Sequence, residues 1–418
     1  MPAADPPDIL WIVTTQWRGQ ACGFAGDPNA RTPHLDVFAR QAVVFEQAFS
    51  NHPFGPFARA VLLTGLLSPE NGVRDYWDPL PREADTIARR LAATGYATAF
   101  FGKWHLAPRD RTAAVVGETH ARQLVAPEDR GGFEFWEGFE GGFQLNDPWL
   151  HGTRLPAPVQ FRGHQADVLC ARAAEWLQTA APHPRPSEPT ATAAPPASRP
   201  RFVVVSLESP HPPYAAATPA DVPPCDPAAL VLAPNVPRGG EIEETARREL
   251  SGYYRQIETT DRALGRLLAR VDPASTAIFI TSAHGDMHGA HGLFRKGWPY
   301  EEAVRVPLVA RWPGAQPQRV RTPVSLADLP ATAVALAGAS LPLSWPGADL
   351  RPLLRETDRC VPLSMPSAPP FERQCPHPWS GWRSRDELHV FTADGSPWLE
   401  FDLRADPWQE HNRAARER

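Results

Sequence analysis

Near its start the chain carries an unbroken apolar run, and two kinds of hydrophobic pattern alternate after it. Residues Ile9–Val13 read Ile-Leu-Trp-Ile-Val behind a proline-rich lead-in, which is typical of a strand covered on both faces of a sheet. Similar runs predict buried strands at Ala97–Phe101, Phe202–Leu207 and Ala277–Thr281. Helical spacing marks Leu35–Gln41, Ala60–Thr64, Ala88–Thr94 and Ala246–Val271. This alternation predicts a parallel sheet flanked by helices, with Ile9–Val13 as a central strand.

Polar residues follow four of these predicted elements at the point where a strand ends. They occupy positions 14–16, 103–105, 208–211 and 282–286. Because ligands bind beyond the carboxyl ends of the strands in open α/β sheets, we expect these four segments to converge on one site.

The pattern changes after residue 350. Short segments at Leu388–Phe391 and Trp398–Phe401 are separated by Asp-Gly-Ser-Pro, which predicts a hairpin. We therefore predict an α/β domain over residues 1–350 and a small antiparallel sheet subdomain over 351–418. Within the first domain, residues 182–200 are rich in Pro and Ala and lack periodicity, which predicts a disordered surface insertion.

Composition narrows the possible partners and the compartment. Hydrophobic residues at 42%, with 14 Trp, can build a large core, and a net charge of −5 without a Lys/Arg block gives no reason to expect nucleic acid or a membrane surface. No cationic and apolar leader opens the chain, and we expect a cytoplasmic protein. Five scattered cysteines predict reduced, mostly buried thiols.

Several segments resemble type I sulfatases of the alkaline phosphatase superfamily, in order and spacing. They are Pro7–Gln16, Arg31–Asp36, Phe101–Leu106, Pro210–Tyr214, Gly285–Met287, Arg305–Leu308 and Phe401–Pro407. Single tetrapeptides are weak signals, but seven in the same order cover essentially the whole chain. The resemblance implies an α/β fold with a large, mainly parallel mixed sheet sandwiched by helices and a small antiparallel C-terminal subdomain.

The resemblance also places the family's nucleophile. The family signature runs from a Cys, converted to formylglycine, to an Arg four residues later, and Arg59 fixes that register here. Gly55 then stands at the nucleophile position, in the segment Gly-Pro-Phe-Ala-Arg. Glycine has no side chain to oxidise, and no Ser or Thr replaces it.

The family's calcium site is degenerate by the same comparison. The positions that correspond to its ligands are Thr15, Gln16, Ala283 and His284, so the anchoring aspartates are missing. Hard cations need anionic oxygen ligands, and we predict no metal and no other cofactor. A separate site for another metal at His284, His288 and His291 stays open as a weaker hypothesis.

The groups that handle sulfate in the family are all present, namely Arg59, Lys103, His105, His211 and Lys296. Lys103 and Lys296 are the only lysines, which indicates a specific need for them. Loss of two carboxylates and a cation leaves Arg59, Lys103 and Lys296 facing each other, and we expect three buried cations that require an anion. The alternatives without a binding role are that Arg59 is structural, that one of the two lysines is a solvated surface residue, and that His105 and His211 are core histidines. Asp36, Asp328 and Asp402 are interpreted as structural.

Three functions follow as hypotheses. The first is a pseudoenzyme that binds an anionic small molecule bearing a sulfate, phosphate or carboxylate group through the five residues. The second is a metal-independent enzyme in which His105 or His211 acts as general acid or base. The third is a residual sulfuric-ester or phosphoric-ester hydrolase. The oligomeric state is not predicted.

Overall fold

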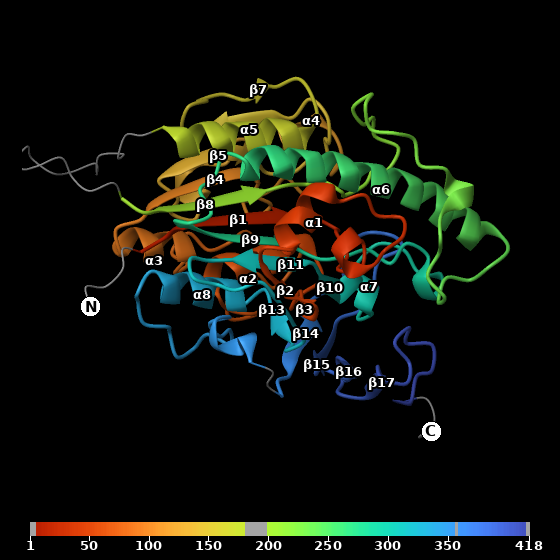
Figure 1. Cartoon of the computed structure of the whole chain (residues 1–418). Coiled ribbons are helices and arrows are strands. Elements are labelled where there is room, and N and C mark those ends of the chain that lie inside the picture. Colours follow the sequence, from red (N-terminus) through yellow and green to blue (C-terminus); the bar gives the residue numbers. More distant parts are fainter. Residues whose placement is uncertain (1–5, 180–198, 356–357, 415–418) are drawn as a thin grey trace, which may run out of the picture.

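The fold is centred on one large twisted sheet, whose strands run across Figure 1 one below the other. The structure is a computed structural model that describes residues 6–179, 199–355 and 358–414. The sheet has ten strands in the order β12-β2-β11-β9-β1-β8-β4-β5-β6-β7. Their bounds are β1 Asp8–Thr14, β2 Val43–Phe45, β4 Ala97–Lys103, β5 Phe135–Phe139, β6 Trp149–Gly152, β7 Val159–Gln160, β8 Arg201–Ser206, β9 Thr276–Ser282, β11 Leu308–Arg311 and β12 Gln318–Val320. The central strands β9, β1, β8, β4 and β5 run parallel, whereas β11 and β6 are antiparallel to their neighbours.

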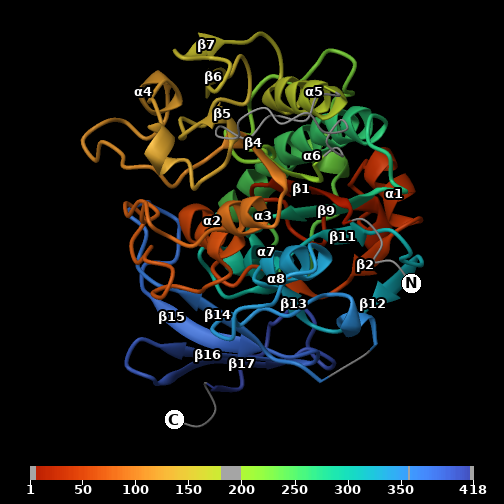
Figure 2. The ribbon, with the colours of Figure 1, turned by 90° about the vertical axis from the view of Figure 1, so that its left-hand side faces the viewer.

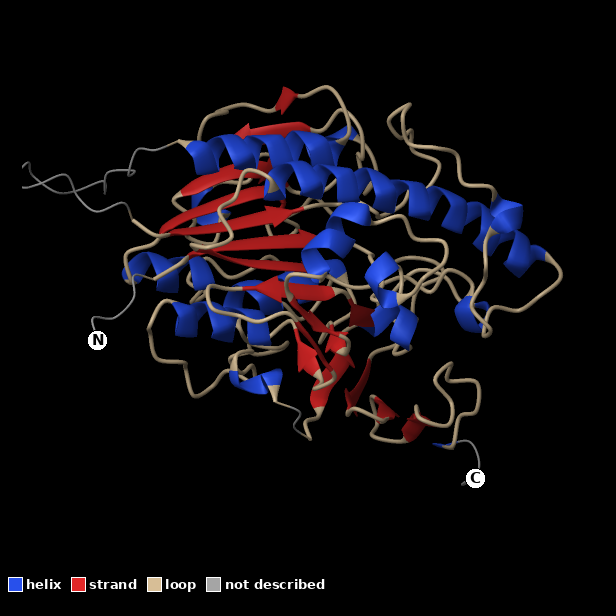
Figure 3. Ribbon diagram, in the orientation of Figure 1, coloured by secondary structure: helices blue, strands red, loops and turns tan. Residues whose placement is uncertain are grey.

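Helices cover both faces of this sheet (Figure 3). Alternate residues of β1 point to opposite faces, so Leu10 and Ile12 pack in one core and Ile9, Trp11 and Val13 in the other. The first core is completed by α1 Pro33–Ala39, α5 Gln165–Gln178 and the long α6 Glu241–Leu268. The second is completed by α2 Gly55–Thr64, α3 Ile87–Ala93 and α8 Asp328–Leu336. The shorter helices are α4 Glu118–Ala121 and α7 Glu301–Val304.

Two smaller sheets complete the fold. The first joins β10 Arg305–Val306, β3 Ala48–Phe49 and β13 Val324–Ser325. The second is antiparallel and contains β14 Val361–Met365, β15 Trp379–Arg383, β16 Glu387–Thr392 and β17 Pro397–Asp402. Figure 2 shows this sheet below α2 and α8. The Ser364 amide donates to the Asn51 carbonyl at 2.8 Å, which ties β14 to the segment that leads into α2.

The predicted elements agree with the structure to within a few residues at their ends. The strand at Ile9–Val13 is central, the α/β class is confirmed, and the predicted hairpin is β16 and β17. Asp36, Asp328 and Asp402 accept hydrogen bonds from nearby backbone amides, as expected of structural aspartates. The predicted insertion at 182–200 lies outside the described residues apart from its last two positions.

All five thiols are free, as the sequence predicts, with Cys22, Cys170 and Cys375 buried, Cys225 half-buried and Cys360 exposed.

Within the described ranges, no helix has the length and apolarity needed to cross a bilayer.

Candidate anion-binding site

A cavity of about 590 Å³ opens at the carboxyl ends of β1, β4, β8 and β9. Because these strands are parallel neighbours, the segments that follow them meet at one edge of the sheet, as predicted. The sequence-predicted residues that line it are Thr15, Gly55, Lys103, His105, His211, His284 and Lys296. The remaining lining is mainly apolar: Phe54, Tyr76, Ala114, Val115, Val116, Phe143, Pro212, Pro213, Arg295, Phe371 and Gln374.

Gly55 is the first residue of α2, and the imidazole of His105 lies against it. A Cβ atom built on Gly55 would come within 2.9 Å of His105 Nδ1 and 3.2 Å of His105 Cε1. A Cβ contact under 3.0 Å requires an atom to shift, so a side chain at position 55 would have to displace the His105 ring. Nδ1 is buried without a partner, and Nε2 lies 3.4 Å from the Tyr76 hydroxyl.

Lys103 ends β4 and has a carboxylate partner that the sequence analysis did not anticipate. Its Nζ donates to Glu208 Oε1 at 2.6 Å, and both side chains are at most 1% exposed. The expectation of three buried cations without a counter-ion was therefore wrong, because the segment after β8 turns Glu208 inward. Burial lowers the pKa of Lys103 to about 8, with Arg59 adding to the effect and Glu208 opposing it.

Lys296 reaches the inner part of the cavity from the loop after β9. Its Nζ donates to Gln16 Oε1 at 2.6 Å and lies 2.9 Å from His211 Nε2. Burial, with the nearby charge of Lys103, holds the pKa of Lys296 well below its usual value. Burial and the charge of Lys296 likewise keep the pKa of His211 well below its usual value, so its imidazole is neutral near pH 7.

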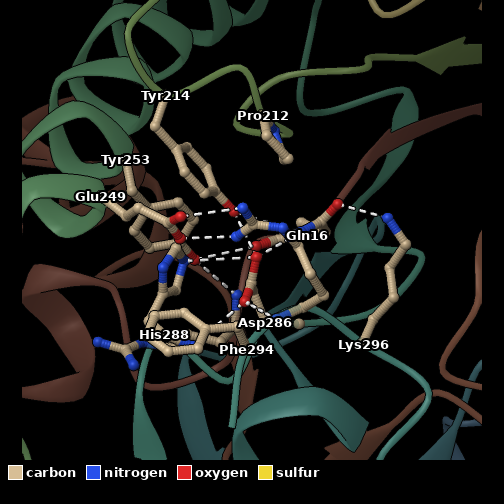
Figure 4. Close-up of polar contacts among 12 residues, drawn as sticks. Gln16, Pro212, Tyr214, Glu249, Tyr253, Asp286, His288, Phe294 and Lys296 are labelled. Atoms are coloured by element: carbon tan, nitrogen blue, oxygen red, sulfur yellow. Dashed lines mark hydrogen bonds and ion pairs between the residues drawn. The ribbon is translucent and has the colours of Figure 1, made fainter. Parts of the chain in front are cut away.

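Asp286 accepts hydrogen bonds from several residues in this part of the site and so connects them (Figure 4). Its Oδ2 accepts hydrogen bonds from Gln16 Nε2 and from the Tyr214 hydroxyl. Its Oδ1 accepts the Arg295 amide at 2.9 Å and the His288 amide at 3.2 Å. Burial acts to raise the pKa of Asp286, but His288, Arg295 and the Tyr214 hydrogen bond together hold it below the usual range. Asp286 is therefore an ionised, fully bonded carboxylate.

These bonds leave no oxygen cage for calcium at the family's metal position. The Thr15 hydroxyl donates to the Leu207 carbonyl at 2.9 Å and accepts from Arg59 Nη2 at 2.8 Å. The Gln16 amide is bonded at both ends, Ala283 offers no side-chain oxygen, and His284 Nδ1 lies 2.9 Å from the Gly285 carbonyl. The residues present therefore do not fit a hard divalent cation.

The three histidines of the segment after β9 each pack against a different aromatic ring. His284 stacks on Phe54 with ring centroids 6.4 Å apart, and its Nε2 is buried without a partner. His288 packs against Tyr253 at 4.3 Å, and His291 stacks on Tyr300 at 4.1 Å. Across the described part of the chain, no cluster of three or more His, Cys, Asp or Glu side chains has the arrangement of a metal site.

Arg59 lies behind the cavity wall rather than in it. Besides Thr15, its guanidinium donates to the Gly55 carbonyl at 3.3 Å and to Ser206 Oγ at 3.5 Å, and the side chain is 4% exposed. Burial lowers the pKa of Arg59 to about 10, against the opposing charges of Glu208 and Glu140. Arg59 remains a cation near pH 7 and supports the cavity from its inner side.

Several residues of the site, among them Gln16, His105, Phe143 and Arg295, have left-handed backbone conformations that favour glycine. Gln16 has a φ of 65° and His105 a φ of 62°. Such conformations cost about 1–3 kcal/mol each and persist where surrounding contacts over-determine them. Here Gln16 is held by Asp286 and Lys296, and His105 by Tyr76 and the backbone of Glu140.

Known relatives match over nearly the whole chain. The family profile described as Sulfatase matches residues 7–339. The chain is a member of the sulfatase family. This sulfatase-family chain is 32% identical to the ulvan-active sulfatase of Formosa agariphila, over 97% of its own length and 76% of that protein. It is 30% identical to the steryl-sulfatase of Mus musculus, over 85% and 66% of the two chains.

A solved structure shares the fold. The putative sulfatase YidJ from Bacteroides fragilis superposes with a TM-score of 0.82 at 24% identity, covering 100% of this sulfatase-family chain and 93% of the other. The fold and the family expected from the resemblance are thus established.

Sequence reasoning missed Glu208, Tyr76 and Phe371. Glu208 lies in the predicted strand-end segment 208–211, and that position is the signal that could have identified it. The family resemblance points only to His211 in this segment. Tyr76 and Phe371 lie in loops far from any matched motif, and no local signal in the sequence assigns them to the cavity.

Proposed function

We propose that this sulfatase-family chain binds an anionic small molecule and does not carry out formylglycine- and metal-dependent ester hydrolysis. The observation that carries the proposal is the contact between Gly55 and His105. Glycine itself offers no nucleophile at the head of α2, and His105 Nδ1 lies 2.9 Å from the point where a Cβ atom at position 55 would stand. The saturated hydrogen bonds of Thr15 and Gln16 support the second half of the proposal, because they leave no ligands for a hard cation.

The anion is held by groups at the inner end of the cavity. The amino groups of Lys103 and Lys296 supply hydrogen-bond donors and, when protonated, positive charge; of the two, Lys103 has a carboxylate partner, Glu208. Buried cations in a water-poor site attract an anion more strongly than exposed ones do. Arg59 adds positive charge from behind through Thr15. Because relatives are named sulfatases, a sulfate or sulfonate group is the first choice, and phosphate and carboxylate share the same chemistry.

Binding and turnover measured side by side test this proposal. Isothermal titration with sodium sulfate and methanesulfonate, in EDTA, is expected to give saturable binding. The double variant Lys103→Met, Lys296→Met should lose that binding. Hydrolysis of 4-nitrophenyl sulfate and 4-nitrophenyl phosphate should stay at the level of the buffer, with calcium or with EDTA. Absence of binding in the wild type, or calcium-dependent turnover that EDTA removes, would overturn the proposal.

One observation favours a metal-independent enzyme as a second candidate. His105 and His211 both line the cavity, and His105 Nδ1 is buried without a hydrogen-bond partner, so an imidazole nitrogen is left to exchange a proton with a bound ligand. That candidate predicts turnover of an anionic substrate in EDTA, lost in His211→Gln with binding retained. A residual hydrolase would instead show slow release of 4-nitrophenol in the same assay.

A further inference from the structure

The inner and outer parts of the cavity differ in chemistry. At the inner end, Lys103, His105, His211 and Lys296 are between 1% and 6% exposed. Toward solvent the walls are formed by half-buried Phe143, Phe371 and Val115 and by Val116, which is 66% exposed. A small inorganic anion would fill only a fraction of the 590 Å³. The remaining space therefore accommodates an organic body of drug-like size.

The aromatic wall is assembled from four separate parts of the chain. Phe371, from the β14–β15 connection, lies parallel to Phe54 with centroids 6.4 Å apart, and it meets Tyr76 edge-on at 4.9 Å. On another side, Phe143 stacks on His211 at 4.5 Å with an angle of 15° between the rings. Flat apolar surfaces of this kind bind rings by stacking and by burial of apolar area.

Groups that would recognise a sugar are scarce in the same walls. Among the described residues that line the cavity there is no Asp or Glu. The Arg295 guanidinium is engaged by Glu249 in two bonds of 2.6 and 2.9 Å. Gln374 is the amide that remains, with a buried Oε1 that lacks a partner. A polyhydroxylated ligand would thus lose hydrogen bonds to water without regaining them.

We propose that the cavity selects an anion carried on an aromatic or similarly flat apolar body, and discriminates against sulfated or phosphorylated sugars. This inference rests on the proposed function, because the inner cations must hold the charged group while Phe371, Phe54 and Phe143 contact the body. The shared chemistry of the head group is a sulfonate or sulfate ester; the body decides specificity.

The test compares ligands with one head group and different bodies. Isothermal titration of the full chain uses 2-naphthalenesulfonate, methanesulfonate and glucose 6-sulfate. Naphthalenesulfonate is expected to bind at least about tenfold more tightly than methanesulfonate, since it buries much more apolar surface. Glucose 6-sulfate should bind no more tightly than methanesulfonate.

Variants of the wall separate this inference from the proposed function. Phe371→Ala should lower the naphthalenesulfonate affinity about tenfold and leave the methanesulfonate affinity unchanged, and Phe371→Leu should show a smaller loss with the apolar volume retained. Leu343→Ala, at a fully exposed leucine, is the matched control and should change neither. If methanesulfonate binds but naphthalenesulfonate binds no better, or the sugar sulfate binds best, the inference is wrong and the proposed function stands. If no anion binds, both fail.

Discussion

The Nδ1 atom of His105 lies 2.9 Å from the point where a Cβ atom on Gly55 would stand. His105 is itself packed edge-on against Tyr76, at 5.6 Å between centroids, which restricts the ring on that side. This contact links the glycine at the predicted nucleophile position to the packing of the site. Restoring a side chain at 55 therefore requires a rearrangement as well as a substitution.

Gly55→Ala is expected to destabilise the protein by about 1–3 kcal/mol, because it overpacks a buried site. A loss of stability would be informative, because replacing Gly by Ala within a helix otherwise stabilises a protein by about 0.5–1 kcal/mol. Gly141→Ala is the matched control, because its Cβ would meet its nearest neighbour at an ordinary 3.9 Å. Chemical denaturation measures both. In the double variant Gly55→Ala, His105→Ala the two effects should be non-additive. Equal stabilities of the two alanine variants would show that His105 does not occupy the space.

Glu208→Gln should destabilise the protein by about 3–5 kcal/mol, because it leaves Lys103 buried without its carboxylate. Sulfate should then restore part of the lost stability, since a bound anion substitutes for the missing charge. The measurement is the midpoint of thermal unfolding against sulfate concentration.

Glu137→Gln provides the comparison for Glu208. Glu137 is equally buried and bonded to Arg154 and Arg172, but neither arginine lines the cavity, whereas Lys103, the partner of Glu208, does. Its loss should also destabilise, without a greater response to sulfate than the wild type shows. Equal responses in the two variants would argue against an anion near Lys103.

The affinity for sulfate should fall as the pH rises above about 8. The anion binds the charged form of Lys103, whose pKa in the free protein is lowered to about 8 by burial and by Arg59, against Glu208. Below that pH the Lys103 ammonium is already present, so its contribution to the affinity is constant; above it, the loss of this charge lowers the affinity by at most about tenfold per pH unit. Isothermal titration between pH 6.5 and 9.5 measures the slope. Lys103→Arg keeps its charge and should flatten the profile, whereas a wild-type profile that is level to pH 9.5 would contradict the assignment.

Removal of metal ions should leave the protein unchanged. Because the Thr15 and Gln16 side chains are saturated and Ala283 carries no ligand, dialysis against EDTA is expected to alter neither the midpoint of unfolding nor the affinity for sulfate. The shift produced by sulfate in the same experiment shows that the assay is sensitive. Saturable stabilisation by calcium or zinc would overturn the prediction.

The layered fold was predictable because it depends on local patterns. The apolar runs within Ile9–Val13 and Phe202–Leu207 are typical of strands buried on both faces, and parallel neighbours bring their carboxyl ends together. The same rule brought Lys103 and His211 to one cavity, and the family resemblance supplied Lys296 and the register that placed Gly55 at the nucleophile position.

Only the tertiary structure decided how these groups are partnered. Glu208 and Lys103 lie 105 residues apart in the chain, and Gln16 and Lys296 lie 280 apart. Gly55, at the start of α2, contacts His105, which follows β4. Side-chain direction in loops such as those of Glu208, Tyr76 and Phe371 follows no period, so sequence alone does not determine it. By itself the sequence determined the fold and the family, and it predicted the loss of the catalytic groups. The tertiary structure decided the charge balance of the site and the aromatic lining of its walls, because both depend on contacts between residues that the chain keeps far apart.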